Sequence, residues 1–213
     1  AEDIVLAAVR ASAAEHGIWV HLGSLALAEG DKRVNRAFVI DPAGEIVGRY
    51  DKMHLFDVDL PTGESWRESA VYRAGDAAVV VRGTPVGELG LTICYDLRFP
   101  AMFERLSEAG AQVIAVPAAF TVPTGEAHWH VLLRARAIEA GLFVVAAAQS
   151  GTHADGRATY GHSLVVGPWG DVLADGGTGE KLLFADIDLD RIAEVRSRLP
   201  AIRHRRPIAP VND

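Results

Sequence analysis

The sequence predicts a layered α/β fold in one domain that covers residues 1–213. Apolar segments of strand length alternate with helical patterns in the centre of the chain, and turn residues join strands into hairpins toward both ends. A chain of 213 residues with 49% hydrophobic content can bury one sizeable core. The sequence contains no repeat, low-complexity tract or linker that would divide it.

The N-terminal quarter of the chain predicts one helix and three strands. Apolar residues recur at helical spacing over residues 4–13, and Gly17 then supplies a C-terminal stop. The tetrapeptide Asp-Pro-Ala-Gly at 41–44 forms turns readily, so the second and third strands make a hairpin. The three strands are predicted at 18–27, 34–40 and 45–50.

After a polar loop at 62–75, strands alternate with helices. Helices at 101–109 and 127–140 end at Gly110 and Gly141, because glycine adopts the left-handed backbone that closes a helix. A short helix at 189–198 precedes the C-terminal tail. The strands of this part are predicted at 77–81, 88–94, 113–116, 142–149, 162–166, 172–174 and 181–187.

Composition narrows the function classes. The net charge of −7 is spread along the chain, which argues against a nucleic-acid surface. No apolar stretch approaches the roughly eighteen residues of a membrane span. Cys94 is the single cysteine, so no intramolecular disulfide can form, and a reducing compartment, by default the cytoplasm, is expected.

No metal or cofactor motif stands out. The chain has 8 histidines, but His128 and His130 flank Trp129 at i and i+2 and so face different ways on a helix. His153 and His162 are too scattered to complete a site. No glycine-rich phosphate loop of the Walker or dinucleotide type is present. We therefore expect neither a metal nor a cofactor.

Cys94 is the first candidate for chemistry. It ends the apolar run 89–93 and is followed by Tyr-Asp-Leu-Arg-Phe-Pro, which leads into a helix. A strand fixes the position of such a thiol, and the start of a helix offers N–H groups and positive dipole to an anion. Taken alone, a lone cysteine after an apolar run is more often a small buried hydrophobic residue. The segments upstream of Cys94 favour a reactive thiol over that structural interpretation.

These upstream segments are Arg-Tyr-Asp-Lys-Met-His-Leu-Phe-Asp at 49–57 and Trp-Arg-Glu-Ser at 66–69. Together with the segment around Cys94 they resemble the nitrilase superfamily, the carbon–nitrogen hydrolases that use a Glu–Lys–Cys triad. Lys52 precedes Cys94 by 42 residues, and Glu68 follows Lys52 by 16 residues, where these amidases carry a supporting glutamate.

The resemblance extends from about Gly17 to Pro207 and looks most like the deaminated glutathione amidase branch. It implies an α-β-β-α sandwich, with two sheets face to face and helices outside, that usually pairs sheet to sheet as a homodimer. Further motifs that carry the resemblance lie at 117–121, 125–129, 132–139, 160–163 and 167–170.

By this resemblance Cys94 is the nucleophile that attacks an amide and forms a thioester. Lys52 is expected to lower the pKa of Cys94 and to hold the oxyanion, with the backbone N–H of Tyr95 as second donor. Glu68 is expected to support the site by orienting Lys52. The structural alternatives are a surface lysine at 52 and a solvated loop acid at 68.

Substrate-binding residues are expected around and after the nucleophile. Arg98 is a candidate for gripping a substrate carboxylate, and an ion pair with Asp96 is an equally good interpretation of that residue. The chain departs from the family at His130, where relatives often carry glutamate, and in the lid-like loop 150–159. The resemblance places the pocket wall at Phe120, Thr121, Glu126, His128 and Trp129.

The general-base glutamate of the family stands upstream of the lysine in a Pro-Glu setting, and no Pro-Glu dipeptide occurs in this sequence. The sequence also begins at Ala1 without a methionine. We expect it to be a fragment that lacks the first strands of the fold together with the catalytic glutamate, and to show no measurable amide turnover alone.

The leading hypothesis is hydrolysis of a small linear amide that bears a carboxylate, such as deaminated glutathione, to an acid and ammonia. An omega-amidase or another amidase of the superfamily is the runner-up, and a catalytically inactive scaffold is the alternative from another class. A redox-sensing thiol is disfavoured because no resolving cysteine is present. The expected partners are the amide and, in a homodimer, a second copy of the chain, with no nucleic acid and no membrane.

Overall fold

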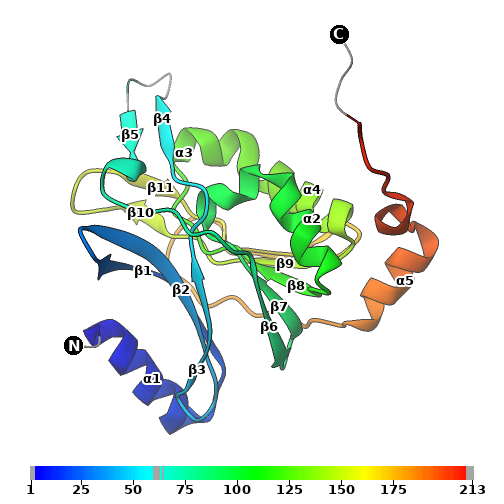
Figure 1. The fold of residues 1–213 in the computed structure, drawn as a ribbon, viewed down its shortest axis with the longest axis horizontal. Helices are drawn as coiled ribbons and strands as arrows, with labels where there is room; N and C mark the ends of the chain where they lie inside the picture. The colour runs from blue at the N-terminus through cyan, green and yellow to red at the C-terminus, as the bar shows by residue number, and fades with distance from the viewer. Residues whose placement is uncertain (1–2, 60–62, 64, 210–213) are drawn as a thin grey trace.

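The chain folds into four layers in the order helix, sheet, sheet, helix (Figure 1). The computed structural model describes residues 3–59, 63 and 65–209. Helix α1 (Ile4–His16) lies on the outer face of a three-stranded sheet. Helices α2 (Pro100–Glu108) and α4 (His130–Ala140) cover the outer face of a six-stranded sheet. This is the α-β-β-α sandwich that the resemblance implies.

The three-stranded sheet is an antiparallel meander of β1 (Val20–Glu29), β2 (Lys32–Ile40) and β3 (Ile46–Asp51). Leu6 and Ala13 of α1 pack on Phe38 and Ile40 of β2, which forms a small outer core. The helix ends at Gly17, whose φ of 62° is the left-handed conformation expected from the sequence.

The six-stranded sheet consists of β6 (Val79–Thr84), β7 (Gly87–Leu91), β8 (Val113–Ala115), β9 (Phe143–Ala146), β12 (Leu164–Val166) and β13 (Val172–Asp175). Their spatial order is β13-β12-β9-β8-β7-β6. β7, β8 and β9 are parallel, and the remaining neighbours are antiparallel. Strands β8 and β9 are apolar, as expected for parallel strands that are covered on both faces.

The main core lies between the six-stranded sheet and its helices. Phe103 and Leu106 of α2 and Leu133 and Ala137 of α4 are buried against the sheet. Helix α5 (Asp190–Arg198) adds Ile192 to the same core from the edge of the sandwich. Aligned apolar positions on each helix thus face one layer, as their helical spacing predicts.

The two sheets approach each other closely between β3 and β6. A side chain at Gly48 of β3 would collide with Val81 of β6, so the closest approach of the layers requires glycine there. Val39 and Tyr50 of the three-stranded sheet are buried in the main core. The inner face of this sheet therefore belongs to the same core as strand β7, which leads to Cys94.

Two small hairpins stand at one end of the sandwich (Figure 1): β4 (Asp57–Asp59) with β5 (Ser65–Arg67), and β10 (Ser150–Thr152) with β11 (Ala158–Tyr160). The guanidinium of Arg157 lies 5.0 Å from the ring centre of Trp66, which brings the hairpins together. The other short segments are α3 (Val122–Thr124), a π-helical turn at Gly125–Trp129 and 3₁₀ turns at Glu68–Ala70, Cys94–Arg98 and Ala201–His204.

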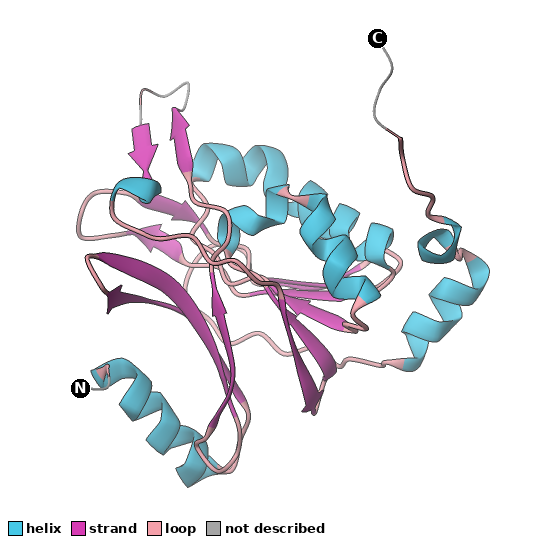
Figure 2. Cartoon of the chain, in the orientation of Figure 1, coloured by secondary structure: helices cyan, strands magenta, loops and turns pink. Residues whose placement is uncertain are grey.

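Three sequence predictions differ from this fold. Residues 181–187 form no strand and run as a loop toward α5 (Figure 2). The loop at 62–75 contains β5, and the lid-like loop at 150–159 is largely the β10–β11 hairpin. Both hairpins are short and polar, so they carry little of the apolar alternation from which strands are predicted.

No helix among the described residues is both long and apolar enough to cross a membrane.

Candidate active site

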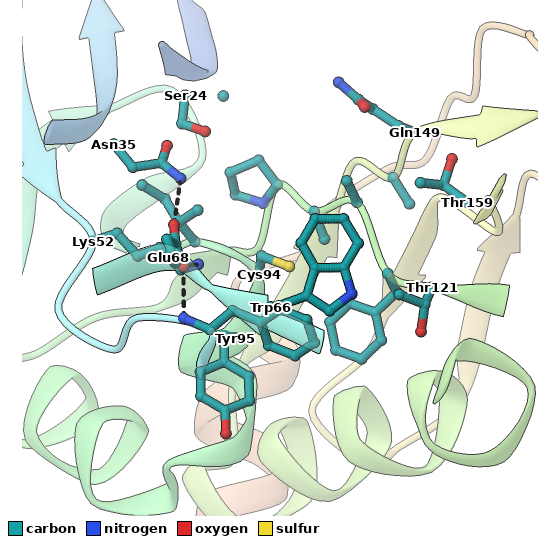
Figure 3. Close-up of a pocket in the computed structure, with 18 of the residues that line it drawn as sticks. Ser24, Asn35, Lys52, Trp66, Glu68, Cys94, Tyr95, Thr121, Gln149 and Thr159 are labelled. Atoms are coloured by element: carbon teal, nitrogen blue, oxygen red, sulfur yellow. Dashed lines mark hydrogen bonds and ion pairs between the residues drawn. The ribbon is translucent and has the colours of Figure 1, made fainter. Parts of the chain in front are cut away.

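A cavity of about 660 Å³ opens at the end of the sandwich that carries the two hairpins. Strands β1 and β2, the turn after β7, the segment after β8 and the β10–β11 hairpin all contribute to its wall (Figure 3). Among the residues that line it are Ser24, Asn35, Lys52, Phe56, Trp66, Arg67, Glu68, Cys94, Tyr95, Arg98, Phe120, Thr121, Gln149, Arg157 and Thr159.

Cys94 stands at the point where the chain leaves β7 and enters the 3₁₀ turn. Its sulfur faces the cavity (Figure 3). The backbone φ is 49°, in the left-handed region that residues with a side chain seldom adopt. The amide donates a 2.9 Å hydrogen bond to the carbonyl of Pro117, which holds this conformation in place. Such strain costs about 1–3 kcal/mol and is common at functional sites.

Lys52 is a buried cation beside the thiol, with a side chain only 4% exposed. Its Nζ lies 2.6 Å from Oε2 of Glu68. Its backbone is fixed as well, because its amide donates to the Asn35 carbonyl and its carbonyl accepts from the Gly75 amide, each at 2.9 Å. The surface-lysine alternative is therefore wrong for this residue.

Glu68 is held by donors from three directions. Besides Lys52, the side-chain amide of Asn35 donates to Oε1 at 3.3 Å, and the backbone N–H of Phe56 donates to Oε2 at 2.6 Å (Figure 3). These bonds fix the carboxylate, and through it the ammonium of Lys52. Glu68 is thus no solvated loop acid, and it is the one carboxylate among the described residues of the cavity wall.

The pKa of Cys94 departs from the expectation. Burial raises the pKa of the thiol above its ordinary value, and this outweighs the lowering by the Lys52 charge and by the backbone N–H of Ala119. The charges of Glu68 and Asp96 raise the pKa further. The expectation of a lowered pKa took account of the Lys52 charge alone, whereas in the structure burial has the larger effect and Glu68 acts against Lys52. The resting form of Cys94 is therefore the protonated thiol.

Tyr95 places two different groups at the site. Its backbone N–H is at the start of the 3₁₀ turn, where the first amides of a helix have no acceptor within the helix. Its ring packs edge-on against Phe56 and Phe99, with centroid distances of 5.0 and 5.4 Å. The ring contacts fix the turn that carries the amide next to Cys94.

Asp96 is fully buried and pairs differently from the expectation. Its carboxylate accepts from the Tyr50 hydroxyl at 2.6 Å, from the Ile93 amide at 2.8 Å and from the His54 amide at 3.1 Å. Nδ1 of His54 lies a further 2.8 Å from Oδ1. With its oxygens occupied in this way, Asp96 forms no ion pair with Arg98, and that interpretation of Arg98 is wrong.

Arg98 instead lies over aromatic rings at the cavity wall. Its guanidinium carbon is 5.9 Å from the ring centre of Tyr95 and 5.4 Å from that of Phe120. One guanidinium nitrogen lies 3.3 Å from Nδ1 of His128. None of the ion pairs found among the described residues involves Arg98. Phe120 and Thr121 also line the cavity, as expected from the sequence.

Three expected pocket residues lie elsewhere. Glu126 and His128 are exposed, and Trp129 is completely buried with its Nε1 donating to the carbonyl of His162 at 2.8 Å. None of them is among the described residues that line the cavity. The π-helical turn is responsible, because it directs Trp129 into the core and its neighbours outward.

Several residues of the cavity wall were not predicted from the sequence to lie at the site. Asn35 belongs to β2, Trp66 and Arg67 to β5, and Gln149 and Thr159 to the region of the β10–β11 hairpin. The hairpin is bound to the wall by a bridge between Thr121 and Thr159. No local motif marks Asn35, Gln149 or Thr159, and only the tertiary fold brings them to the wall around Cys94. Trp66 and Arg67 stand in the segment 66–69, but only Glu68 of that segment was expected at the site.

This arrangement can perform nucleophilic chemistry on a carbonyl. A thiol at a strand end faces a cavity, and a buried ammonium held by a carboxylate lies beside it. The comparisons agree with this class. Residues 2–197 match the model of the carbon-nitrogen hydrolase family, and the chain belongs to that family.

Relatives of the chain carry the name deaminated glutathione amidase. A deaminated glutathione amidase of Synechocystis is 47% identical over 178 residues, which cover 83% of this chain and 65% of the relative. The deaminated glutathione amidase of Dictyostelium discoideum is 46% identical, and the match covers 91% of this chain and 68% of the relative. The chain thus spans about two thirds of the length of these relatives.

Solved structures show the same fold. The NitFhit protein of C. elegans superposes with a TM-score of 0.89 at 42% identity, over 95% of this chain and 50% of that protein. An amidase from Nesterenkonia sp. matches with a TM-score of 0.74 at 31% identity, over 92% of this chain and 73% of the amidase. That structure shows acrylamide added to the active-site cysteine of the amidase.

Proposed function

We propose that the chain hydrolyses a small linear amide that bears a carboxylate, releasing the acid and ammonia through a thioester on Cys94. The observation that carries this proposal is the position of the Cys94 thiol, which faces the cavity beside the buried Lys52–Glu68 pair. The names of the amidase relatives support an active hydrolase over the inactive scaffold, and over the fragment without amide turnover, that were considered from the sequence.

In the first half of the reaction, the sulfur of Cys94 attacks the amide carbonyl, and negative charge develops on the carbonyl oxygen. The Lys52 ammonium and the Tyr95 backbone N–H are placed to stabilise that oxygen. The carbon–nitrogen bond then breaks, and the proton of the thiol has to reach the leaving nitrogen so that ammonia departs. Glu68 keeps Lys52 in position while charge moves.

In the second half, water attacks the thioester and the carbon–sulfur bond breaks. The same oxyanion donors serve this step, because negative charge develops on the same oxygen. The product acid leaves, and Cys94 recovers its proton. The raised pKa of Cys94 makes the neutral thiol the stable resting form, so the proton that this thiol loses is the one that the leaving nitrogen takes up as ammonia departs.

The charges of the cavity wall support an anionic substrate. Arg67, Arg98 and Arg157 line the cavity, whereas Glu68 is the one carboxylate of the described wall and is neutralised by Lys52. Arg67 and Arg157 already pair with Asp59 and Asp155. We therefore assign the substrate carboxylate to Arg98, whose fork-shaped guanidinium suits bidentate binding.

The size of the cavity supports a peptide-like substrate. About 660 Å³ lies in the middle of the range found for small-molecule sites, roughly 300–1,000 Å³. A cavity of this size has room for an amide as large as deaminated glutathione and does not restrict the site to the short 2-oxo acid amides taken by an omega-amidase. A comparison of kcat/KM on these two substrates separates the two functions.

The charge assignment has a direct test. Ammonia release is measured on two amides of equal length, one ending in a carboxylate and one in a neutral methyl group. Arg98→Gln should raise KM for the charged amide by roughly 10- to 100-fold, the worth of a charge-assisted hydrogen bond, and leave the neutral amide nearly unchanged. Arg82→Gln, far from the cavity, is the matched control. Equal losses on both amides would contradict the assignment.

We further propose a homodimer in a reducing cytoplasmic setting. Val131 and Ile138 are exposed on one face of α4, and Ile138 contacts Gly170 beside the exposed Trp169. A second copy of the chain would cover this apolar face. A reducing compartment would keep Cys94 available as a thiol, since oxidation would remove the nucleophile. Sedimentation of the purified chain tests the dimer.

A further inference from the structure

A second group of polar side chains meets outside the cavity. His130 begins α4, His162 precedes β12, and Asp175 ends β13. Nε2 of His130 lies 3.0 Å from Oδ2 of Asp175, and Nδ1 of His162 lies 2.9 Å from Oδ1. None of the three lines the cavity as far as the chain is described. His162, which looked too scattered in sequence to complete a site, has its ring centroid only 5.0 Å from that of His130.

The backbone holds His162 and Asp175 in fixed relation. The β12–β13 ladder places Leu164 opposite Asp175. Beyond the ladder, the amide of His162 donates to the Gly177 carbonyl, and the amide of Gly177 donates to Oδ1 of Asp175, each at 2.7 Å. Two of the three side chains are thus attached to one rigid hairpin, and the first turn of α4 supplies the third.

The conformation of His162 is itself unusual. Its φ is 56°, and Cys94 is the only other described residue besides glycine with a positive φ. The carbonyl of His162 accepts from Nε1 of Trp129 at 2.8 Å, and its imidazole stacks on Tyr160 at a centroid distance of 4.4 Å. A non-glycine residue in this region costs about 1–3 kcal/mol, and such strain concentrates at functional sites. Here it directs the imidazole toward Asp175.

We propose that His130, His162 and Asp175 bind one divalent transition-metal ion of the zinc type. Imidazole nitrogens and a carboxylate oxygen are typical zinc donors, whereas magnesium and calcium prefer oxygen alone. The three ligand atoms lie within 4.8 Å of one another. Two donors at about 2.0 Å from a tetrahedral ion are about 3.3 Å apart, close to the two nitrogen–oxygen separations found here.

The surroundings leave room for an ion and for water. The side chains are partly exposed, at 32% for His130, 23% for His162 and 34% for Asp175. Solvent can therefore reach the site and supply the fourth ligand of a tetrahedral ion. The ion would replace the protons that now lie between the imidazoles and the carboxylate.

The ion would join the start of α4 to the β12–β13 hairpin. The π-helical turn before His130 packs on Tyr160, because a side chain at Gly125 would collide with that ring. Tyr160 in turn follows Thr159 of the cavity wall. The metal would thus be structural and would hold the outer support of the wall, and it would take no part in the chemistry at Cys94.

The test is calorimetric titration of Zn²⁺ into the chelator-treated chain, in a Cys94→Ser background that removes the cavity thiol as a competing ligand. One equivalent should bind, and Co²⁺ in its place should give the visible absorption of a four-coordinate ion. His130→Gln, Asp175→Asn and His162→Asn should each weaken the binding by at least about tenfold. Asparagine is chosen at 162 because it tolerates a positive φ. His16→Gln, which removes an exposed histidine, is the matched control.

Circular dichroism of the variants in chelator confirms that each still folds. The proposal is overturned if the parent binds no stoichiometric Zn²⁺, which would leave the group a hydrogen-bonded His–Asp–His contact. It is equally overturned if His130→Gln and Asp175→Asn bind as tightly as the control. Weakening of the three ligand variants with an unchanged control supports it, whatever the amidase activity of the same samples.

Discussion

The hydroxyl of Tyr50 on β3 donates a hydrogen bond of 2.6 Å to the carboxylate of Asp96, which stands two residues after Cys94. The same carboxylate accepts from the amide of His54. Tyr50 and His54 lie on either side of Lys52, so one buried acid joins the segment of Lys52 to the turn that carries Cys94. The distance between Lys52 and Cys94 depends on this link.

Asp96→Asn should therefore lower both stability and activity. An amide group offers one acceptor oxygen where the carboxylate offers two, so at least one donor among Tyr50, Ile93 and His54 is left buried and unpaired. We expect a loss of about 1–3 kcal/mol in the free energy of unfolding, measured by urea denaturation. Asp31→Asn, in the exposed β1–β2 turn, should match the parent. An Asp96→Asn chain with parental stability and kcat would refute the linking role.

Cys94→Ala should abolish amide hydrolysis and leave folding close to that of the parent. In the proposed mechanism the thiol forms the covalent bond to the substrate, whereas the change removes little buried volume. Mass spectrometry of the parent under turnover should show the acyl adduct at Cys94, and the variant should show none. Ammonia release that persists in Cys94→Ala would exclude the thioester route.

Lys52→Arg should lose at least about a hundredfold in kcat, the scale of removing one oxyanion donor. A planar guanidinium keeps the charge but cannot occupy the place of a compact ammonium 2.6 Å from Glu68. Steady-state kinetics on one amide provide the measurement. Lys181→Arg, at an exposed position, is the control and should retain parental rates. A mild effect at 52 would make the residue merely structural.

The thiol should respond to Glu68 in a direction that can be worked out in advance. Glu68 raises the pKa of Cys94 and Lys52 lowers it. Glu68→Gln should therefore lower that pKa and speed alkylation by iodoacetamide at neutral pH, whereas Lys52→Met should slow it. The parent should react more slowly than free cysteine, because burial keeps the thiol protonated. Rates that rank in the opposite order would contradict this electrostatic account.

His21 should make stability fall in mild acid. Burial lowers the pKa of His21 from 6.5 to about 4, and its Nε2 has no hydrogen-bond partner. Between pH 6.5 and about pH 4 the imidazole of His21 holds a proton in the unfolded chain but not in the native chain. The free energy of unfolding therefore decreases as the pH falls through this range. The effect reaches up to about 3 kcal/mol. Urea midpoints measured from pH 7 to pH 4 should decline less steeply in His21→Leu, and His16→Gln should keep the parental slope.

The elements that sequence predicted well are those with local causes. Helix α1 ends at Gly17 and α4 at Gly141 because both glycines adopt a left-handed backbone that few other residues tolerate. The β2–β3 hairpin forms around its turn at 41–44, and the buried strand β8 lies within the apolar run from which it was predicted. Each of these elements is determined by residues that are neighbours in the sequence, so it can be predicted without knowing the distant contacts.

The strand predicted at 181–187 fails for a tertiary reason. The segment has strand-like composition, but it pairs with no strand among the described residues, and Leu182 and Phe184 are each 83% exposed. Strand formation requires a neighbour as well as a pattern. Conversely, the β10–β11 hairpin forms from a polar segment because it can pair with itself and with Thr121.

The site divides in the same way. Lys52, Glu68 and Cys94 were found because each stands in a recognisable local segment, and the structure brings them together. Asn35 was missed because its contact with Glu68 joins residues 33 positions apart. The raised pKa of Cys94 was missed because it reflects burial, which the neighbouring sequence letters do not report.

The left-handed backbone at Cys94 also limits how far the stability of this protein can be raised without loss of activity. Glycine would adopt that φ without strain, and Cys94→Gly would relieve it, yet the same change deletes the thiol. Under the proposed mechanism, stability and activity are thus in conflict at a single position. A laboratory selection for thermal stability alone would favour inactive variants substituted at residue 94. Any screen for more stable variants therefore has to select for turnover in every round.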